Sequence, residues 1–91
     1  MLILTDAQVV TLLRTPDNDL VEFMLSLSNL SRKEKEALDL CARQKLTREE
    51  AAEEMDRSVD AVQKWYRDGI KKVRKTLAGR WWTMRLALFH F

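Results

Sequence analysis

The sequence is poor in residues that break or cross-link a chain. Its 91 residues include one cysteine, one proline and two glycines, and no stretch approaches the roughly 20 apolar residues that a membrane-spanning helix needs. A single cysteine excludes an internal disulfide and is typical of a reducing cytoplasm. The first residues lack the basic start and small-residue cleavage site of a secretion signal. We therefore expect a cytoplasmic protein that does not act at a membrane.

Residues suited to catalysis or metal binding are equally scarce. The only histidine, His90, has no cysteine or carboxylate at the spacing of metal ligands. The glycines are too few for a loop that cradles phosphate, and Cys41 lies among apolar residues, where a small core residue is expected. The sequence therefore predicts a protein that is not an enzyme and holds no metal or cofactor.

Helix-forming residues dominate what is present. Hydrophobic residues make up 46% of the chain and charged residues 33%, which favours a folded protein over a disordered one. No run of alternating β-branched residues indicates a strand. We predict one all-α domain of about five helices over residues 1–91. It would comprise a core at 19–77, an N-terminal extension at 1–18 and a hydrophobic tail at 79–91.

Capping signals divide the chain into elements. Ser31 precedes Glu34 by three residues and Thr47 precedes Glu50 by three, which is the spacing of a capping box at the start of a helix. Pro16 marks the clearest break. These signals predict helices over residues 5–14, 19–27, 31–44, 47–55 and 59–77, the last ended by Ala78-Gly79.

Residues 46–67 are the most informative segment, LTREEAAEEMDRSVDAVQKWYR. They predict two short amphipathic helices joined by about three turn residues, with small Ala52 at the crossing and Val62 and Trp65 facing inward. Asp56 falls where the first helix must end, a position at which φ is often positive. This pattern predicts a helix-turn-helix, whose second helix can lie in the major groove of DNA.

Charge is divided unevenly between the two parts of the chain. Residues 1–56 hold 7 Lys and Arg against 12 Asp and Glu, whereas residues 57–91 hold 9 against 2. The positive charge therefore coincides with the second helix of the motif and its continuation, where a phosphate backbone would lie.

The last residues, RWWTMRLALFHF, form an aromatic tail. Three interpretations stay open: the tail covers the N-terminal helices, forms an interface with a second copy or a partner, or binds a membrane surface. So much aromatic area is seldom left exposed, so an interface, including a homodimer, is a serious alternative. The residues that would form it are Trp81, Trp82, Met84, Leu88, Phe89 and Phe91.

Residues 20–77 resemble region 4 of bacterial sigma factors and the similar LuxR-type DNA-binding domains. The lead-in FMLSLSNLSRKEKEALDL, the first motif helix LTREEAAEEM and the second, RSVDAVQKWYRDGIKKVRKTL, each parallel the segments that those families share. The long basic helix after the turn is closer to the sigma type. Asp56 stands where those families usually carry glycine.

The resemblance implies which residues would contact DNA. Exposed positions of the second motif helix meet base edges in such families, and the start of the first meets phosphate. The positions that would meet bases are Ser58, Val59, Asp60, Gln63, Lys64 and Arg67. The positions that would meet the phosphate backbone are Thr47, Arg48, Lys71, Lys72 and Lys75.

Two functions follow from these observations. The sequence predicts a sequence-specific transcription regulator that binds double-stranded DNA. The alternative is a sigma-like adaptor that binds RNA polymerase or another protein without recognising DNA. Asp60 and the acidic segment 49–54 favour the adaptor, because their charge opposes DNA.

Overall fold

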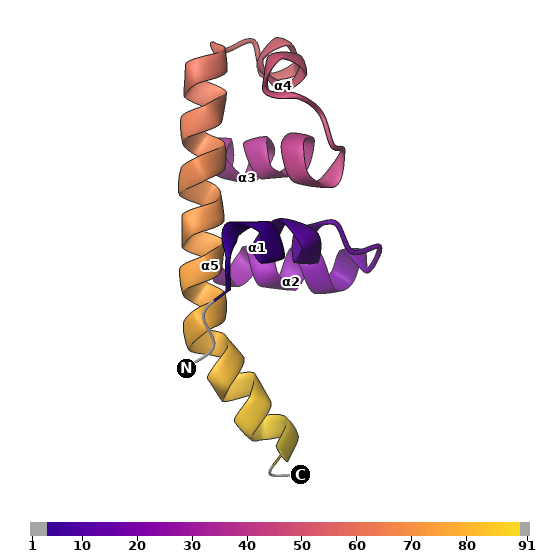
Figure 1. Cartoon of the computed structure of the whole chain (residues 1–91), viewed down its shortest axis with the longest axis vertical. Helices are drawn as coiled ribbons and strands as arrows, with labels where there is room; N and C mark the ends of the chain where they lie inside the picture. The colour runs from indigo at the N-terminus through magenta and orange to yellow at the C-terminus, as the bar shows by residue number, and fades with distance from the viewer. Residues whose placement is uncertain (1–3, 90–91) are drawn as a thin grey trace.

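The protein is built on one long helix with the other helices stacked along it (Figure 1). The computed structural model describes the backbone of residues 4–89 and the side chains of residues 4–78. No strand occurs among the described residues, so the predicted all-α class is confirmed. The elements are α1 (Asp6–Leu13), α2 (Asn18–Leu27), α3 (Arg32–Leu38), the π-helical turn η1 (Asp39–Arg43), α4 (Arg48–Met55) and α5 (Val59–Phe89).

Polar caps set the helix starts. Thr5, Ser31 and Thr47 each accept a hydrogen bond from the backbone N–H three residues on, and the side chain of that residue accepts one from the cap's own N–H. These capping boxes satisfy donors that a helix start leaves free. Ser58 caps α5 in the simpler way, its Oγ accepting from the N–H of Ala61 at 3.2 Å. The predicted starts are therefore confirmed.

Two hydrophobic clusters lie along α5, and both include residues of this helix. The first joins α1, α2 and α3 to its middle and is completed by Ile70, Val73 and Leu77. The second joins α3 and α4 to its first turns through Val62. Residues 1–18, expected to be an extension, supply α1 to the first cluster.

Packing in the two clusters fixes the positions of the helices. Val9 and Leu13 of α1 are at most 1% exposed, so α1 is firmly packed against α5. Cys41 is 2% exposed in the second cluster and is the small core residue that the sequence predicted. Among the described residues no helix is long and apolar enough to cross a membrane.

Two helix boundaries differ from the prediction. The helix expected over 31–44 changes at Asp39 to a π-helical turn, a difference of one residue in hydrogen-bond spacing that apolar periodicity does not reveal. The last helix does not stop at Ala78-Gly79 but continues to Phe89. One interior glycine costs about 1 kcal/mol, which strong helix formers on both sides offset.

The aromatic tail therefore begins as a continuation of α5, which runs beyond the other helices (Figure 1). The side chains predicted to form an interface lie outside the described residues. Those positions are Trp81, Trp82, Met84, Leu88, Phe89 and Phe91.

Candidate nucleic-acid interface

A tight left-handed turn joins α4 to α5. The N–H of Arg57 donates to the carbonyl of Ala52 at 3.0 Å, and the N–H of Asp56 donates to the carbonyl of Glu53 at 3.2 Å. This pair of bonds is the Schellman arrangement, and it requires a left-handed residue just past the helix. Asp56 takes that conformation with φ of 53°. The structure thus has the helix-turn-helix that the sequence predicted.

The first turns of α5 present one apolar and one polar face. Val62 is completely buried and Trp65 packs partly against the second cluster. Gln63, Lys64 and Arg67 lie on the opposite side and are exposed. The helix is thus anchored by its apolar face and leaves the three predicted base-reading side chains available to a ligand.

A row of cations extends this polar face along α5. Lys64, Arg67, Lys71 and Lys75 follow one another at spacings of three, four and four residues, so they lie on one side of the helix. We call them the basic stripe. All four are exposed, and within the described residues none forms a salt bridge. Their charge is therefore available to an anionic partner.

Arg48, expected to meet phosphate, is turned toward the protein. Its guanidinium lies 3.8 Å from the centre of the Tyr66 ring. It also acts on Cys41: burial raises the pKa of that thiol, and the charge and hydrogen bond of Arg48 oppose the increase. Thr47, next to it, is exposed, but its hydroxyl and its N–H are both engaged with Glu50 in the cap. Hydrogen bonds to the Glu50 carboxylate, first from the Thr47 N–H and then from the Thr47 hydroxyl, hold the pKa of Glu50 below its ordinary value.

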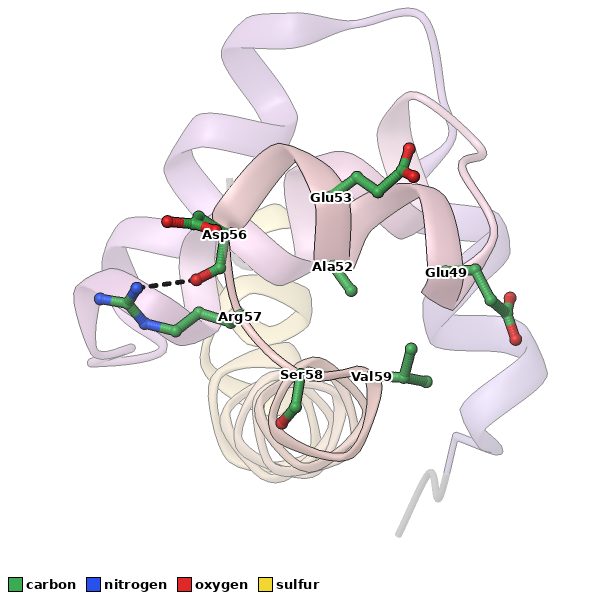
Figure 2. Close-up of a pocket in the computed structure, with 7 residues that line it drawn as sticks. All are labelled: Glu49, Ala52, Glu53, Asp56, Arg57, Ser58 and Val59. Carbon is green, nitrogen blue, oxygen red and sulfur yellow. Dashed lines mark hydrogen bonds between the residues drawn. The ribbon is translucent and has the colours of Figure 1, made fainter.

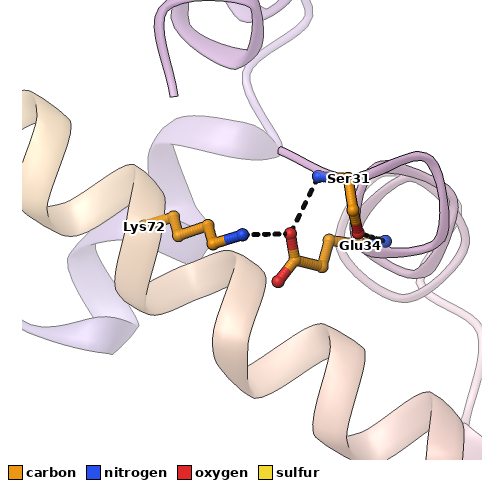
Figure 3. A network of polar contacts seen from close by, with 3 residues as sticks. All are labelled: Ser31, Glu34 and Lys72. Carbon is orange, nitrogen blue, oxygen red and sulfur yellow. Dashed lines mark hydrogen bonds and ion pairs between the residues drawn. The ribbon is translucent and has the colours of Figure 1, made fainter. Parts of the chain in front are cut away.

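Lys72, also expected on the DNA backbone, faces α3 instead. Its Nζ lies 2.7 Å from Oε1 of Glu34, whose side chain is 7% exposed (Figure 3). Burial acts to raise the pKa of Glu34, but the Lys72 ammonium and the N–H and hydroxyl of Ser31 together hold it below the ordinary value. Lys72 thus neutralises a buried carboxylate, and its contact with the DNA backbone stays a prediction.

An acidic notch lies beside the turn. It is an open hollow of about 530 Å³. Figure 2 shows Glu49 and Glu53 projecting from α4 on one side, with Ser58 and Val59 at the start of α5. Val59 is half-buried against the second cluster. Of the predicted base-reading residues at this end, Ser58 and Asp60 are exposed. The notch therefore surrounds the start of α5 with negative charge.

Two arginines were missed by the sequence reasoning. Arg74 lies on the flank of the basic stripe and donates to Oδ1 of Asp6 at 2.9 Å. Its place seven residues after Arg67 on one helix was the available signal. Arg57 lines the notch, and its Nη1 donates to the Asp56 carbonyl at 2.9 Å. No local pattern distinguishes such a turn arginine from any exposed one.

Two helices joined by a tight turn, with the second facing solvent, define a helix-turn-helix protein. The chain belongs to the family described as Sigma-70, region 4, whose model matches residues 20–73, more than half of the chain. The match confirms the predicted sigma resemblance, whereas the LuxR-type resemblance stays a prediction. No curated protein and no solved structure matches the chain. Membership indicates a DNA-binding or sigma-like regulatory role, with DNA or RNA polymerase as partner.

Proposed function

We propose that this protein is a sequence-specific transcription regulator that binds duplex DNA through the outward face of α5. The observation that carries the proposal is the basic stripe, which begins beside Gln63 on the second helix of the motif and continues for three turns. Lysine and arginine on such a face can bind phosphate or guanine, and glutamine can pair with adenine. The protein would act in the cytoplasm without a cofactor or a catalytic step.

A binding titration tests the proposal. Fragments selected from random duplex DNA are bound to the full chain at several salt concentrations, and affinity is measured by fluorescence anisotropy. The logarithm of the association constant should fall linearly with the logarithm of salt concentration, with a slope of about −0.9 for each phosphate neutralised. Absence of binding to every fragment at low salt would overturn the proposal.

Single substitutions then assign roles within the stripe. Lys64→Ala or Arg67→Ala should weaken binding by about 1–3 kcal/mol and relax specificity at one position if that side chain reads a base. A phosphate contact should instead weaken all sequences alike and reduce the salt slope by about 1. Arg32→Ala removes an exposed cation from the start of α3 and serves as the control with unchanged binding.

A second candidate function is an adaptor that binds RNA polymerase. Two large apolar side chains of α2 favour it: Leu20 is 40% exposed and Phe23 is 49% exposed. Neither contributes to the two buried clusters. Exposed apolar pairs of this kind are typical anchors for a protein partner.

Purified RNA polymerase distinguishes the two functions. An adaptor should bind the polymerase without DNA and lose that binding on Phe23→Ser, whereas Arg67→Ala should leave it intact. A DNA-binding regulator should show the reverse dependence in the DNA titration. Polymerase binding that is equal for the parent and Phe23→Ser would remove α2 as the docking surface.

A homodimer through the tail stays a prediction. Light scattering of the full chain and of a chain ending at residue 79 would give the two masses. A dimer that becomes a monomer on truncation supports the tail as an interface, and a full chain that is already a monomer contradicts it.

A further inference from the structure

The first helix packs on the buried face of α5, and its first residue reaches the flank of the basic stripe. Asp6, the first residue of α1, forms a salt bridge with Arg74 at 2.9 Å. Both residues lie outside residues 20–73, which match the family model. Asp6 is exposed and Arg74 lies four residues from Ile70, the buried contact between α1 and α5. A carboxylate of the chain itself therefore occupies one cation at the edge of the basic stripe.

A pocket connects this salt bridge to the predicted DNA contacts. It has a volume of about 250 Å³ and lies between the start of α1, the start of α4 and the middle of α5. Its cations are Arg48, which stacks on Tyr66, and Arg67. Asp6 is the one carboxylate in its wall. Gln63 also lines the pocket.

The charges around the pocket are those of a phosphate site with one acid in its lining. Two arginines and the amide of Gln63 can donate hydrogen bonds to phosphate oxygens. A carboxylate accepts from the same donors as a phosphate does, so Asp6 and a DNA phosphate would compete for them. Two anions in one pocket of this size would repel each other, because little water separates them.

We propose that α1 competes with DNA for the same cations. Asp6 pairs with Arg74 and lines the pocket of Arg48 and Arg67, so a DNA phosphate must displace the Asp6 carboxylate. The ligand is a phosphodiester group of duplex DNA. On binding, Arg74 exchanges the Asp6 carboxylate for a phosphate oxygen. This inference rests on the proposed DNA-binding function and adds a segment that limits it.

The test compares Asp6→Asn with the parent chain and with Asp19→Asn. Both substitutions remove one carboxylate from the first turn of a helix, so their effects on net charge and on the helix dipole are matched. Binding to the same selected duplex is measured from low to high salt. Asp6→Asn should bind about three to ten times more tightly at low salt, and this gain should shrink as salt screens the competing carboxylate. Asp19→Asn should change affinity less than twofold.

A second comparison tests the role of Arg74. In the Asp6→Asn background, Arg74→Ala should abolish most of the gain in affinity, because Arg74 is the cation that Asp6 releases. Inorganic phosphate as competitor separates a general anion pocket from a DNA site: millimolar phosphate should not reverse the gain in duplex affinity.

The possible results distinguish a failure of this inference from a failure of the proposed function. A parent chain that binds DNA, with Asp6→Asn indistinguishable from it or from Asp19→Asn, overturns this inference and leaves the proposed function in place. If neither the parent nor Asp6→Asn binds DNA, both are overturned. Circular dichroism of each variant checks that the fold is retained.

Discussion

At the scale of the residue, Asp56 holds the turn of the motif in an unfavourable conformation. Its φ of 53° is left-handed, and a side chain with a Cβ is strained there, though Asp less than most. Glycine has no such strain. The turn therefore carries a stability cost at the position where related families usually have glycine.

Replacing Asp56 with glycine should stabilise the protein. We expect Asp56→Gly to raise the free energy of unfolding by about 0.5–1 kcal/mol, or the melting temperature by about 2–8 °C. Asp56→Ala removes the same charge but keeps the Cβ, so it should be no more stable than the parent. Thermal unfolding by circular dichroism compares the three. Equal gains from both substitutions would mean that charge, not backbone strain, sets the cost.

The Glu34–Lys72 pair gives a prediction with a pH dependence. Lys72→Met leaves a buried carboxylate without its cation, so the protein should lose about 1–2 kcal/mol at pH 7. In the parent the lowered pKa of Glu34 stabilises the fold above the ordinary value of 4.5, and this stabilisation is lost as pH falls through the folded-state pKa. Without Lys72, burial favours the protonated acid.

Urea unfolding at pH 7 and pH 4 measures both effects. The difference between Lys72→Met and the parent should be largest at pH 7 and shrink toward pH 4, because Glu34 without Lys72 takes up a proton more readily than in the parent, where its pKa is lowered. Lys35→Met is the matched control, because Lys35 pairs at 3.4 Å with Glu22 in solvent and should cost under about 0.5 kcal/mol. A loss for Lys72→Met that does not change with pH would contradict this role of the pair.

At the scale of the element, local signals predicted helix starts and missed tertiary contacts. A capping box such as Ser31 with Glu34 involves two residues that are three positions apart, so the sequence shows it directly. The ion pair of Lys72 depends on Glu34, 38 residues away, and the stacking of Arg48 on Tyr66 depends on how α4 crosses α5. Such pairings follow from packing, which residue spacing does not reveal.

At Gly69, the packing of the core outweighs the helix propensity of the residue. A Cβ at this position of α5 would lie 3.0 Å from Cδ1 and 3.1 Å from Cγ of Leu38, which is 1% exposed. Alanine in a helix interior usually gains about 1 kcal/mol over glycine, but crowding a packed core costs about 1–3 kcal/mol. This glycine therefore permits the close approach of α3 to α5.

We expect Gly69→Ala to destabilise the protein by about 1 kcal/mol in urea unfolding. In a Leu38→Ala background the clash is removed, so the same change should become neutral or stabilising. This double-mutant cycle isolates the contact between the two side chains. A Gly69→Ala that stabilises the parent chain would show that Leu38 can move aside.

At the scale of the whole molecule, negative and positive charge occupy neighbouring surfaces. The acidic notch adjoins the start of α5, while the basic stripe follows from Lys64 onward. DNA bound along the stripe would meet repulsion at one end, from Glu53 and from Asp60, which lies four residues before Lys64 on the same face. The acidic end should therefore slow association and weaken the complex.

Removing this repulsion should make DNA association faster. We expect Glu53→Gln and Asp60→Asn each to raise the association rate constant about two- to fivefold at low salt, with the gain disappearing near 0.5 M salt, where screening shortens the range of charge. Glu36→Gln, in the groove between α2 and α3, is the control of equal charge and should have a smaller effect. Stopped-flow fluorescence measures these rates. If Asp60→Asn instead slows or weakens binding, the acid contributes to recognition, for example by accepting from a cytosine amino group, and the start of α5 reads bases despite its charge.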